Sequence, residues 1–292
     1  MKIITHSGGF HADDVFAVAT LHTLYPDASV TRTRDPEVIK TGNFCVDVGG
    51  VYDPEKNLFD HHQTGGAGKR ENGIPYSSFG LVWRSYGERL CGSREIADVL
   101  DREIVEPIDA DDCGVDITKN LFDGLNPFAI GRIINRFRPF AHEKETSMDE
   151  AFTRAVFFAE EIIKREVAHT RDEISAREKV KEIYKSTEDK RILILEEKMP
   201  WEGVVTDELK EVLFVVYEQN SKEWRIKAVR KDWSTFESRK LLPGKWRGKM
   251  GSELAKISGV SDATFCHPNG FTGGAGSKDG VIKMAHFALG DY

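Results

Sequence analysis

The sequence lacks the features of several common protein classes. No apolar run in the 292 residues approaches the length of a membrane-spanning helix. The four cysteines lie far apart without a C-x-x-C pair, which argues against zinc fingers, iron–sulfur clusters and a disulfide framework. The N-terminus shows no basic region followed by an apolar core, so no export or organelle signal is expected. These absences predict a soluble, cytoplasmic protein that does not associate with a membrane.

The first half of the chain predicts an α/β domain. Residues 2–5, 29–33 and 43–48 have the pattern of short strands, and residues 13–24 carry apolar side chains at helical spacing between the first two. Further helices are expected in the first half, including one at 126–137. Strands that alternate with helices predict a parallel sheet with right-handed crossovers.

The pattern changes after a long amphipathic helix. From residue 191 successive strand-like runs predict a smaller α+β domain, which ends with a glycine-rich loop at 270–276 and a helix at 278–289. The predicted division is therefore a metal-binding catalytic domain, a connecting helix and a C-terminal substrate-binding domain: residues 1–146, 147–190 and 191–292.

Histidines and aspartates recur where the predicted strands of the first half end. They are His6, His11, Asp13, Asp14, Asp47, Asp60, His61, His62, Asp109 and Asp112. Ligands of parallel sheets bind beyond the carboxyl ends of the strands. Imidazole and carboxylate donors without thiolates favour Mn²⁺, Co²⁺, Fe²⁺ or Zn²⁺, and Mg²⁺ less. This spacing predicts two divalent ions that would support hydrolysis of a phosphoester.

Each of these residues alone is more often structural. Asp13 and Asp14 could serve only as carboxylates at a helix N-terminus, where the dipole favours negative charge. Asp109 and Asp112 could be two solvated side chains on one helical face. The metal hypothesis therefore depends on their convergence.

The Asp60-His61-His62 triplet, together with the His/Asp cluster on the first strand–helix turn, resembles the DHH phosphoesterase superfamily. Within it, the chain resembles the family related to the melanocyte proliferating gene product. That family has been labelled a metal-dependent protein hydrolase, and its eukaryotic members are associated with 3′-5′ exoribonuclease activity. The stretches that carry the resemblance are Thr5–His6, Phe10–Asp14, Phe59–Gln63, Phe236–Arg239, Leu242–Pro243, Trp246–Gly248, Phe265–His267, Gly270–Phe271 and Gly273–Gly274.

The resemblance implies a DHH-type domain joined by a long helix to a smaller α+β domain, with a site for two metal ions in the cleft. Mn²⁺ is the expected ion, and Co²⁺, Zn²⁺ and Mg²⁺ are alternatives. Carried over residue by residue, the ligands would be His6, His11, Asp13, Asp47, His61 and Asp109.

The resemblance also implies separate roles for the residues around these ligands. Asp47 would bridge the ions, Asp60 would orient His61, and His62 would meet the substrate phosphate, so that Asp47, His61 and His62 are the expected catalytic residues. Asp14 and Asp112 would support the ligands. The spacing from His6 to His11-x-Asp13 departs from the usual His-x-x-x-Asp-x-Asp of the superfamily, which leaves the choice among His11, Asp13 and Asp14 open.

The segment between Trp224 and Lys249 combines nine basic and two acidic residues with interleaved aromatic side chains. Basic groups for phosphates and aromatic rings for bases are typical of proteins that hold single-stranded nucleic acid. The alternative is a solvated sheet edge with tryptophans in the core. The residues expected to bind substrate are His62, Arg239, Arg247, His267, Gly273 and Gly274.

The resulting hypothesis is a metal-dependent phosphodiesterase. It would act as a 3′-5′ exonuclease on single-stranded RNA or short oligonucleotides, with metal-activated hydroxide attacking phosphorus. One alternative is a phosphatase or pyrophosphatase for a small phosphoester. Another is a non-catalytic nucleic-acid-binding protein with a structural metal site. The oligomeric state stays open, with a homodimer among the options.

Overall fold

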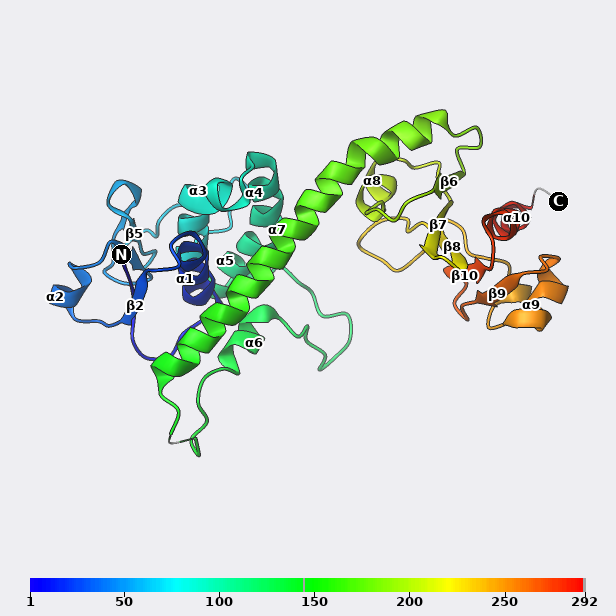
Figure 1. Cartoon of the computed structure of the whole chain (residues 1–292). Helices are drawn as coiled ribbons and strands as arrows, with labels where there is room; N and C mark the ends of the chain where they lie inside the picture. The colour runs from blue at the N-terminus through cyan, green and yellow to red at the C-terminus, as the bar shows by residue number, and fades with distance from the viewer. Residues whose placement is uncertain (144, 291–292) are drawn as a thin grey trace. The chain divides into compact units, whose positions relative to one another are not determined.

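The computed structural model describes residues 1–143 and 145–290, and the chain forms two compact units, Met1–Thr170 and Arg171–Tyr292. The boundary falls inside α7 (Met148–Ser186), so one continuous helix contributes to both units (Figure 1). Each unit contains a mixed α/β arrangement with one sheet, which confirms the α/β prediction. The finer division at residues 146 and 190, and the DHH-type arrangement, stay predictions.

A five-stranded sheet organises the first unit, in the order β2-β1-β3-β5-β4. Its strands are β1 (Lys2–Thr5), β2 (Ser29–Arg32), β3 (Phe44–Val46), β4 (Tyr52–Asp53) and β5 (Leu58–Phe59). The first four in sheet order run parallel, and β4 joins antiparallel at the edge. Ile3 and Ile4 in the central region are fully buried, as expected for parallel strands covered on both faces.

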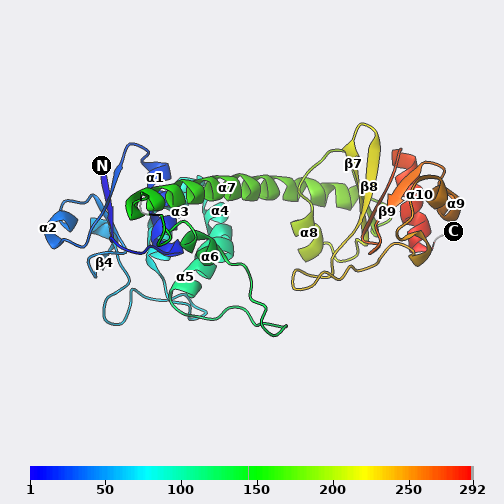
Figure 2. The same ribbon diagram turned by 90° about the horizontal axis from the view of Figure 1, so that it is seen from below.

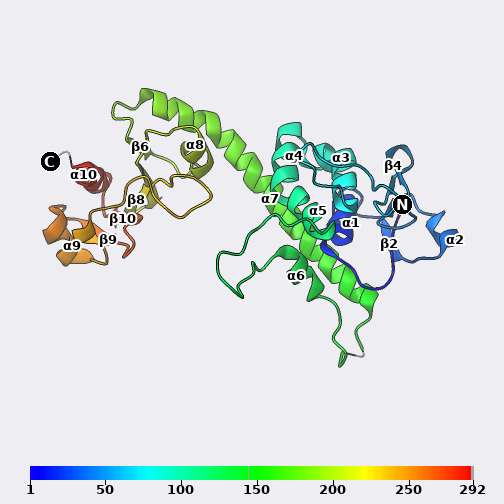
Figure 3. The same cartoon turned by 180° about the vertical axis from the view of Figure 1, so that it is seen from behind.

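Helices lie on both faces of this sheet. The helices of the first unit before α7 are α1 (Ala12–Leu24), α2 (Pro36–Ile39), α3 (Ser78–Cys91), α4 (Arg94–Leu100), a π-helical turn (Asp101–Val105), α5 (Glu106–Asp112) and α6 (Ile130–Asn135). On one face α1 packs against α3, where the rings of Phe16 and Phe79 lie 5.5 Å apart. On the other face α2 covers Ile4 and Cys45, and Figures 1 and 3 show α2 across the sheet from α1 and α3.

Helix α1 brings two acidic side chains into the interior of the first unit. Every residue from Ala12 to Leu21 is buried, because the helix is apolar nearly all round and is enclosed by its neighbours. Asp13 and Asp14 lie in its first turn, so the same packing buries both carboxylates. Their location at the helix N-terminus offsets part of the cost of burying their charge.

The second unit contains another five-stranded sheet, in the order β6-β7-β8-β10-β9. Its elements are β6 (Ile192–Leu195), α8 (Glu202–Asp207), β7 (Phe214–Asn220), β8 (Glu223–Ala228), α9 (Gly251–Ser258), β9 (Ala263–Cys266), β10 (Thr272–Ala275) and α10 (Lys278–Leu289). One face packs on α8 and the last turns of α7, and the other packs on α9 and α10 (Figure 2).

Two sequence predictions about secondary structure are wrong. The helix expected at residues 126–137 is reduced to α6, because Pro127 disfavours helical geometry at Asn126 and the exposed Phe128 finds no core to pack against. The glycine-rich loop expected at 270–276 contains strand β10. Gly273 and Gly274 lie in this strand, and Phe265 packs so closely there that a Cβ at either position would crowd it.

Candidate metal centre

The carboxyl ends of three parallel strands bring the predicted residues together. His6 follows β1, Asp47 follows β3, and the Asp60-His61-His62 triplet follows β5. These strands are neighbours in the sheet, so their ends meet at one edge. Asp47 has a left-handed backbone with φ of 53°, which is uncommon for a residue other than glycine and concentrates at functional sites.

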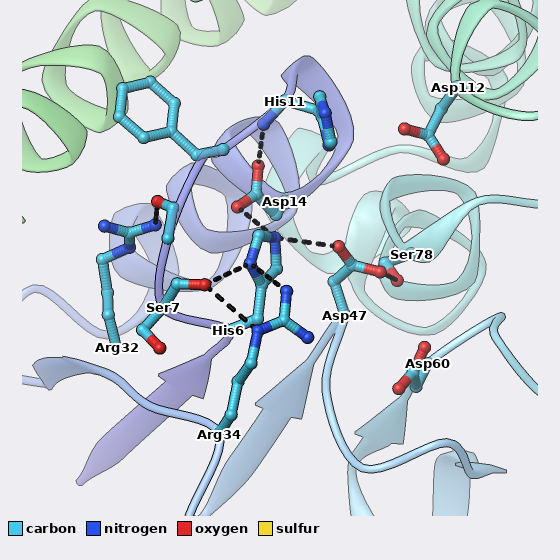
Figure 4. Close-up of polar contacts among 12 residues, drawn as sticks. His6, Ser7, His11, Asp14, Arg32, Arg34, Asp47, Asp60, Ser78 and Asp112 are labelled. Carbon is cyan, nitrogen blue, oxygen red and sulfur yellow. Dashed lines mark hydrogen bonds and ion pairs between the residues drawn. The ribbon is translucent and has the colours of Figure 1, made fainter. Parts of the chain in front are cut away.

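The Asp47 carboxylate lies at the middle of the cluster. Its Oδ2 is 3.3 Å from His6 Nε2, and its Oδ1 is 3.4 Å from His61 Nε2 and 3.2 Å from His62 Nδ1. The Ser78 hydroxyl donates to Oδ1 at 3.0 Å, a bond that Figure 4 shows from the start of α3. The two oxygens therefore face different histidines, an arrangement that suits a bridging ligand.

The first turn of α1 contributes two buried carboxylates. Asp14 accepts a hydrogen bond from the backbone N–H of His11 at 2.8 Å, and its Oδ2 lies 3.1 Å from His6 Nε2 (Figure 4). Asp13 is 0% exposed, and within the described residues neither of its oxygens has a hydrogen-bond partner. A buried carboxylate without a partner is costly, so the residues present fit a cation that would complete this site.

The charges of the cluster shift the pKa values in opposite directions. Burial would lower the pKa of His6 and of His61, but the surrounding carboxylates outweigh it and raise each to about 10. Burial would raise the pKa of Asp47, but its three histidine neighbours hold it well below the usual range. Burial raises the pKa of Asp13 well above normal, and the charges of neighbouring aspartates add to the effect. Protonated histidines therefore offset part of the negative charge of the buried carboxylates.

Four overlapping groups of side chains offer donor atoms close enough to hold an ion. They are Asp47 with His61 and His62, His61 with Asp112 and Cys113, His6 with Asp14 and Asp47, and His11 with Asp13 and Asp112. The structure thus brings together His6, His11, Asp13, Asp47 and His61, five of the six residues expected as ligands. Asp14 and Asp112, expected only to support the ligands, belong to the groups themselves.

Asp109 does not face this cluster, which corrects its expected place. Its carboxylate accepts hydrogen bonds from Arg70 Nη1 at 2.6 Å, Ser77 Oγ at 2.5 Å and the backbone N–H of Gly80 at 2.9 Å. A Cβ at Gly80 would collide with this carboxylate, so the absence of a side chain there lets α5 approach α3. Asp109 anchors α5, and Asp112 at the end of the same helix reaches the cluster instead.

Asp60 also differs from its expected role. Its Oδ1 lies 2.9 Å from His62 Nδ1 and accepts from the His62 backbone N–H at 3.0 Å, and its Oδ2 accepts from the Gly50 N–H. Asp60 therefore orients His62 rather than His61. The His62 side chain is 64% exposed and lines a cavity of about 830 Å³ that also includes His6, Asp47 and Asp112.

The residues expected to bind substrate in the second unit have structural contacts. Arg239 donates to the carbonyls of Val205, Thr206, Leu209 and Val212, and so satisfies backbone oxygens at and beyond the end of α8.

The other residues of the second unit that were expected to bind substrate also have structural contacts. Arg247 Nε donates to the Leu242 carbonyl at 3.1 Å, and His267 Nδ1 accepts from the Asn269 N–H. Gly273 and Gly274 are buried inside β10 and form no open loop for a phosphate. These contacts give the five residues structural roles in the described part of the chain, and their part in substrate binding stays a prediction.

Comparison with known proteins places the chain in a family. A family model named MYG1_exonuc, with the description "Uncharacterised protein family (UPF0160)", matches residues 2–289. The chain belongs to the MYG1 family. It is 30% identical to human "MYG1 exonuclease", covering 99% of this chain and 85% of that protein. It is 32% identical to "MYG1 protein" of Dictyostelium discoideum, over 98% of this chain and 95% of that protein. It is 31% identical to "MYG1 protein C27H6.8" of Caenorhabditis elegans, over 98% of this chain and 94% of that protein.

The family expected from the sequence motifs is thus confirmed, while the DHH superfamily stays a prediction. In this MYG1 chain, no helix of the described residues is both long and apolar enough to cross a membrane.

Two residues beside the cluster were not predicted from the sequence. Cys113 Sγ lies 4.0 Å from His61 Nδ1, and its position next to Asp112 in the sequence could have indicated this. Arg34 lines the cavity, and its Nη2 lies 3.1 Å from His6 Nδ1. Arg34 follows the end of β2, so the rule that placed Asp47 could also have found it.

Proposed function

We propose that this chain is a metal-dependent exonuclease that removes nucleotides from the 3′ end of single-stranded RNA. The observation that carries the proposal is the fully buried Asp13 carboxylate, which has no hydrogen-bond partner in the described residues although six other proposed ligands converge on the same region. The names of relatives support the nuclease class, because the human and rat proteins are called "MYG1 exonuclease".

Two divalent ions, with Mn²⁺ as the first choice, would be held by His6, His11, Asp13, Asp14, Asp47, His61 and Asp112. When bound, they would activate water for attack on phosphorus and neutralise charge on the phosphoryl oxygens. Asp47 supports a two-ion site because its oxygens face different histidines, 3.3 Å from His6 on one side and 3.4 Å from His61 on the other.

His62 is the proposed proton donor to the leaving oxygen. Asp60 and Asp47 both lie beside its Nδ1, at 2.9 and 3.2 Å, which leaves Nε2 available to a substrate in the cavity. Asp47 and Asp60 also raise the pKa of His62, so the ring can carry a proton near neutral pH. In the cleavage, water loses a proton to solvent as it adds to phosphorus, the bond from phosphorus to the 3′ oxygen breaks, and His62 protonates that oxygen. His62 then takes up a proton from solvent, so that the net reaction consumes one water.

The test uses single-stranded RNA labelled at its 5′ end. We expect purified protein with Mn²⁺ to shorten it stepwise and a chelator to stop the reaction. Loss of residues that only support metal ligands already costs roughly 10–100-fold, so Asp47→Asn and His61→Ala should each slow the reaction by more than about 100-fold. His142→Ala, which removes an exposed histidine outside the cluster, should cleave at the wild-type rate.

Full activity in both ligand variants would contradict the proposal. Early release of the label as a mononucleotide would contradict the 3′-5′ polarity alone.

A second candidate keeps the centre and changes the substrate to a small phosphoester or pyrophosphate. The cavity supports it, because about 830 Å³ lies within the range of small-ligand sites and its lining includes the cations Arg34 and Lys40. Comparing turnover of a mononucleotide-sized phosphoester with that of a longer RNA separates the two. Faster turnover of the small substrate would favour this second candidate.

A further inference from the structure

The second unit contains a cavity that none of the expected substrate residues lines. It measures about 620 Å³ and lies where the end of β8 meets the segments around residues 236–241 and 269–271. Its lining includes Lys227, Arg230, Phe236, Leu241, Asn269 and Phe271. This volume falls within the range of pockets that bind small ligands.

An aromatic ring stands open to solvent at this cavity. Phe236 is 89% exposed, and Leu241 and Phe271 beside it are each 37% exposed. The backbone around Phe236 is nevertheless held, because Lys231 N–H donates to the Glu237 carbonyl at 2.9 Å and Arg239 N–H donates to the Val229 carbonyl at 2.7 Å. An anchored segment that exposes a large apolar ring is typical of a binding surface.

The charge beside this ring is unpaired. The Arg230 guanidinium lies 4.7 Å from the centre of the Phe236 ring, and in the described part of the chain no carboxylate pairs with it. Its basic neighbours differ, since Lys231 pairs with Glu237 and Lys227 pairs with Glu202. Because Lys231 neutralises Glu237, the one carboxylate in the lining does not cancel the charge of Arg230.

We propose that this cavity binds one nucleotide of a single-stranded nucleic acid. The base would stack on Phe236 and Phe271, its phosphate would meet Arg230, and the exposed Asn269 side chain would lie within reach of the base edge. An apolar peptide would leave the Arg230 charge without a partner, whereas a nucleotide satisfies the ring and the guanidinium together. The choice of nucleic acid rests on the proposed nuclease function.

Binding is measured without turnover, so that the two proposals fail separately. The full chain in chelator is titrated into a fluorescent single-stranded oligonucleotide of about ten nucleotides, and anisotropy is read at several salt concentrations. We expect Phe236→Ala and Phe236→Leu to weaken binding by about 10-fold without changing the salt dependence, because stacking is lost while the charges stay.

Arg230→Ala should weaken binding and reduce the slope of log affinity against log salt by about 0.7, the value for one phosphate contact on a single strand. Arg230→Lys should keep that slope. Lys222→Ala, which removes an exposed basic residue from the β7–β8 turn, is the matched control for charge. Phe157→Ala, 53% exposed on α7, is the matched control for an exposed ring.

The proposal is overturned if the wild type does not bind, or if Phe236→Ala and Arg230→Ala bind within about twofold of the controls, a difference near the variation of surface substitutions. Sedimentation of the same variants measures their self-association. Oligonucleotide affinity that is unchanged while self-association is lost would make the cavity a protein-binding surface and overturn the proposal. If the wild type hydrolyses no RNA but binds the oligonucleotide, and the Phe236 and Arg230 variants lose this binding, the result would support the nucleotide-binding cavity and reject the nuclease function.

Discussion

Asp13 and Asp109 are two fully buried carboxylates in the same unit, and they have opposite surroundings. Asp109 accepts hydrogen bonds from Arg70, Ser77 and Gly80, whereas Asp13 has no hydrogen-bond partner in the described structure. Burial by itself therefore does not distinguish a structural carboxylate from a functional one. The missing partner does, because folded proteins rarely leave a buried charge without one.

The pKa values express the same difference. Burial raises the pKa of Asp109, but Ser77 and Arg70 oppose this, and the value is about 6. At Asp13 burial is reinforced by Asp47, Asp112 and Asp14, so the pKa lies well above its normal value. A bound cation would reverse the effect at Asp13 and leave Asp109 unchanged.

The largest expected effect is a loss of stability that occurs when Asp109 is replaced but not when Asp112 is replaced. Asp109→Ala should lower the free energy of unfolding by about 3 kcal/mol, because it removes one member of a buried ion pair. Asp112→Ala should change stability by less than about 1 kcal/mol, since this carboxylate is partly exposed, but should weaken Mn²⁺ binding at least about tenfold. Urea denaturation and a metal titration measure the two quantities. The opposite pattern would restore Asp109 as the ligand.

The next effect concerns the missing partner of Asp13. Mn²⁺ at about 100 times its Kd should stabilise the wild type by about 2.7 kcal/mol. Asp13→Asn should stabilise the metal-free protein, because a neutral amide replaces a carboxyl group whose ionisation burial and the neighbouring aspartates oppose, and should lose most of the gain from Mn²⁺. Denaturation with Mn²⁺ and with chelator checks both. Asp109→Asn is the matched control and should keep the gain. Equal stabilisation of Asp13→Asn and the wild type by Mn²⁺ would show that Asp13 needs no cation.

The smallest effect is the pH dependence in chelator. His6 and His61 have pKa values raised to about 10 in the folded protein, so between pH 6.5 and 10 the folded state binds more protons than the unfolded state. Their stabilisation is complete below about pH 6.5 and is lost as the pH rises toward 10. Stability should therefore fall by roughly 1 kcal/mol or more from pH 7 to 9. Asp47→Asn should flatten this dependence, and a flat profile for the wild type would contradict the charge arrangement.

Local rules predicted the half of the site that lies at the sheet edge. His6, Asp47 and His61 each follow a strand, and neighbouring parallel strands end at the same edge whatever the rest of the fold does. The same reasoning predicted the α/β class and the helices at residues 13–24 and 278–289 closely. It failed at 126–129, where Pro127 disfavours a helix and Phe128 has no core to pack against, so that only α6 forms.

Long-range packing decided the points on which the sequence-based assignment failed. Arg239 looks like a phosphate ligand in a basic segment, but carbonyls 27 to 34 residues away take up its donors. Gly273 and Gly274 look like a loop, but the nearby Phe265 leaves space only for glycine within a strand. No local pattern contains these distant neighbours.

The sequence alone determined the family, the α/β class and the positions of His6, Asp47 and His61 after strands, because motifs, strand and helix patterns and side-chain chemistry are properties of the local sequence. The tertiary structure decided which aspartate of α5 reaches that edge. Asp109 and Asp112 are one helical turn apart and equivalent in the sequence. The close approach of α3 at Gly80 gives Asp109 its hydrogen bonds and leaves Asp112 for the cluster.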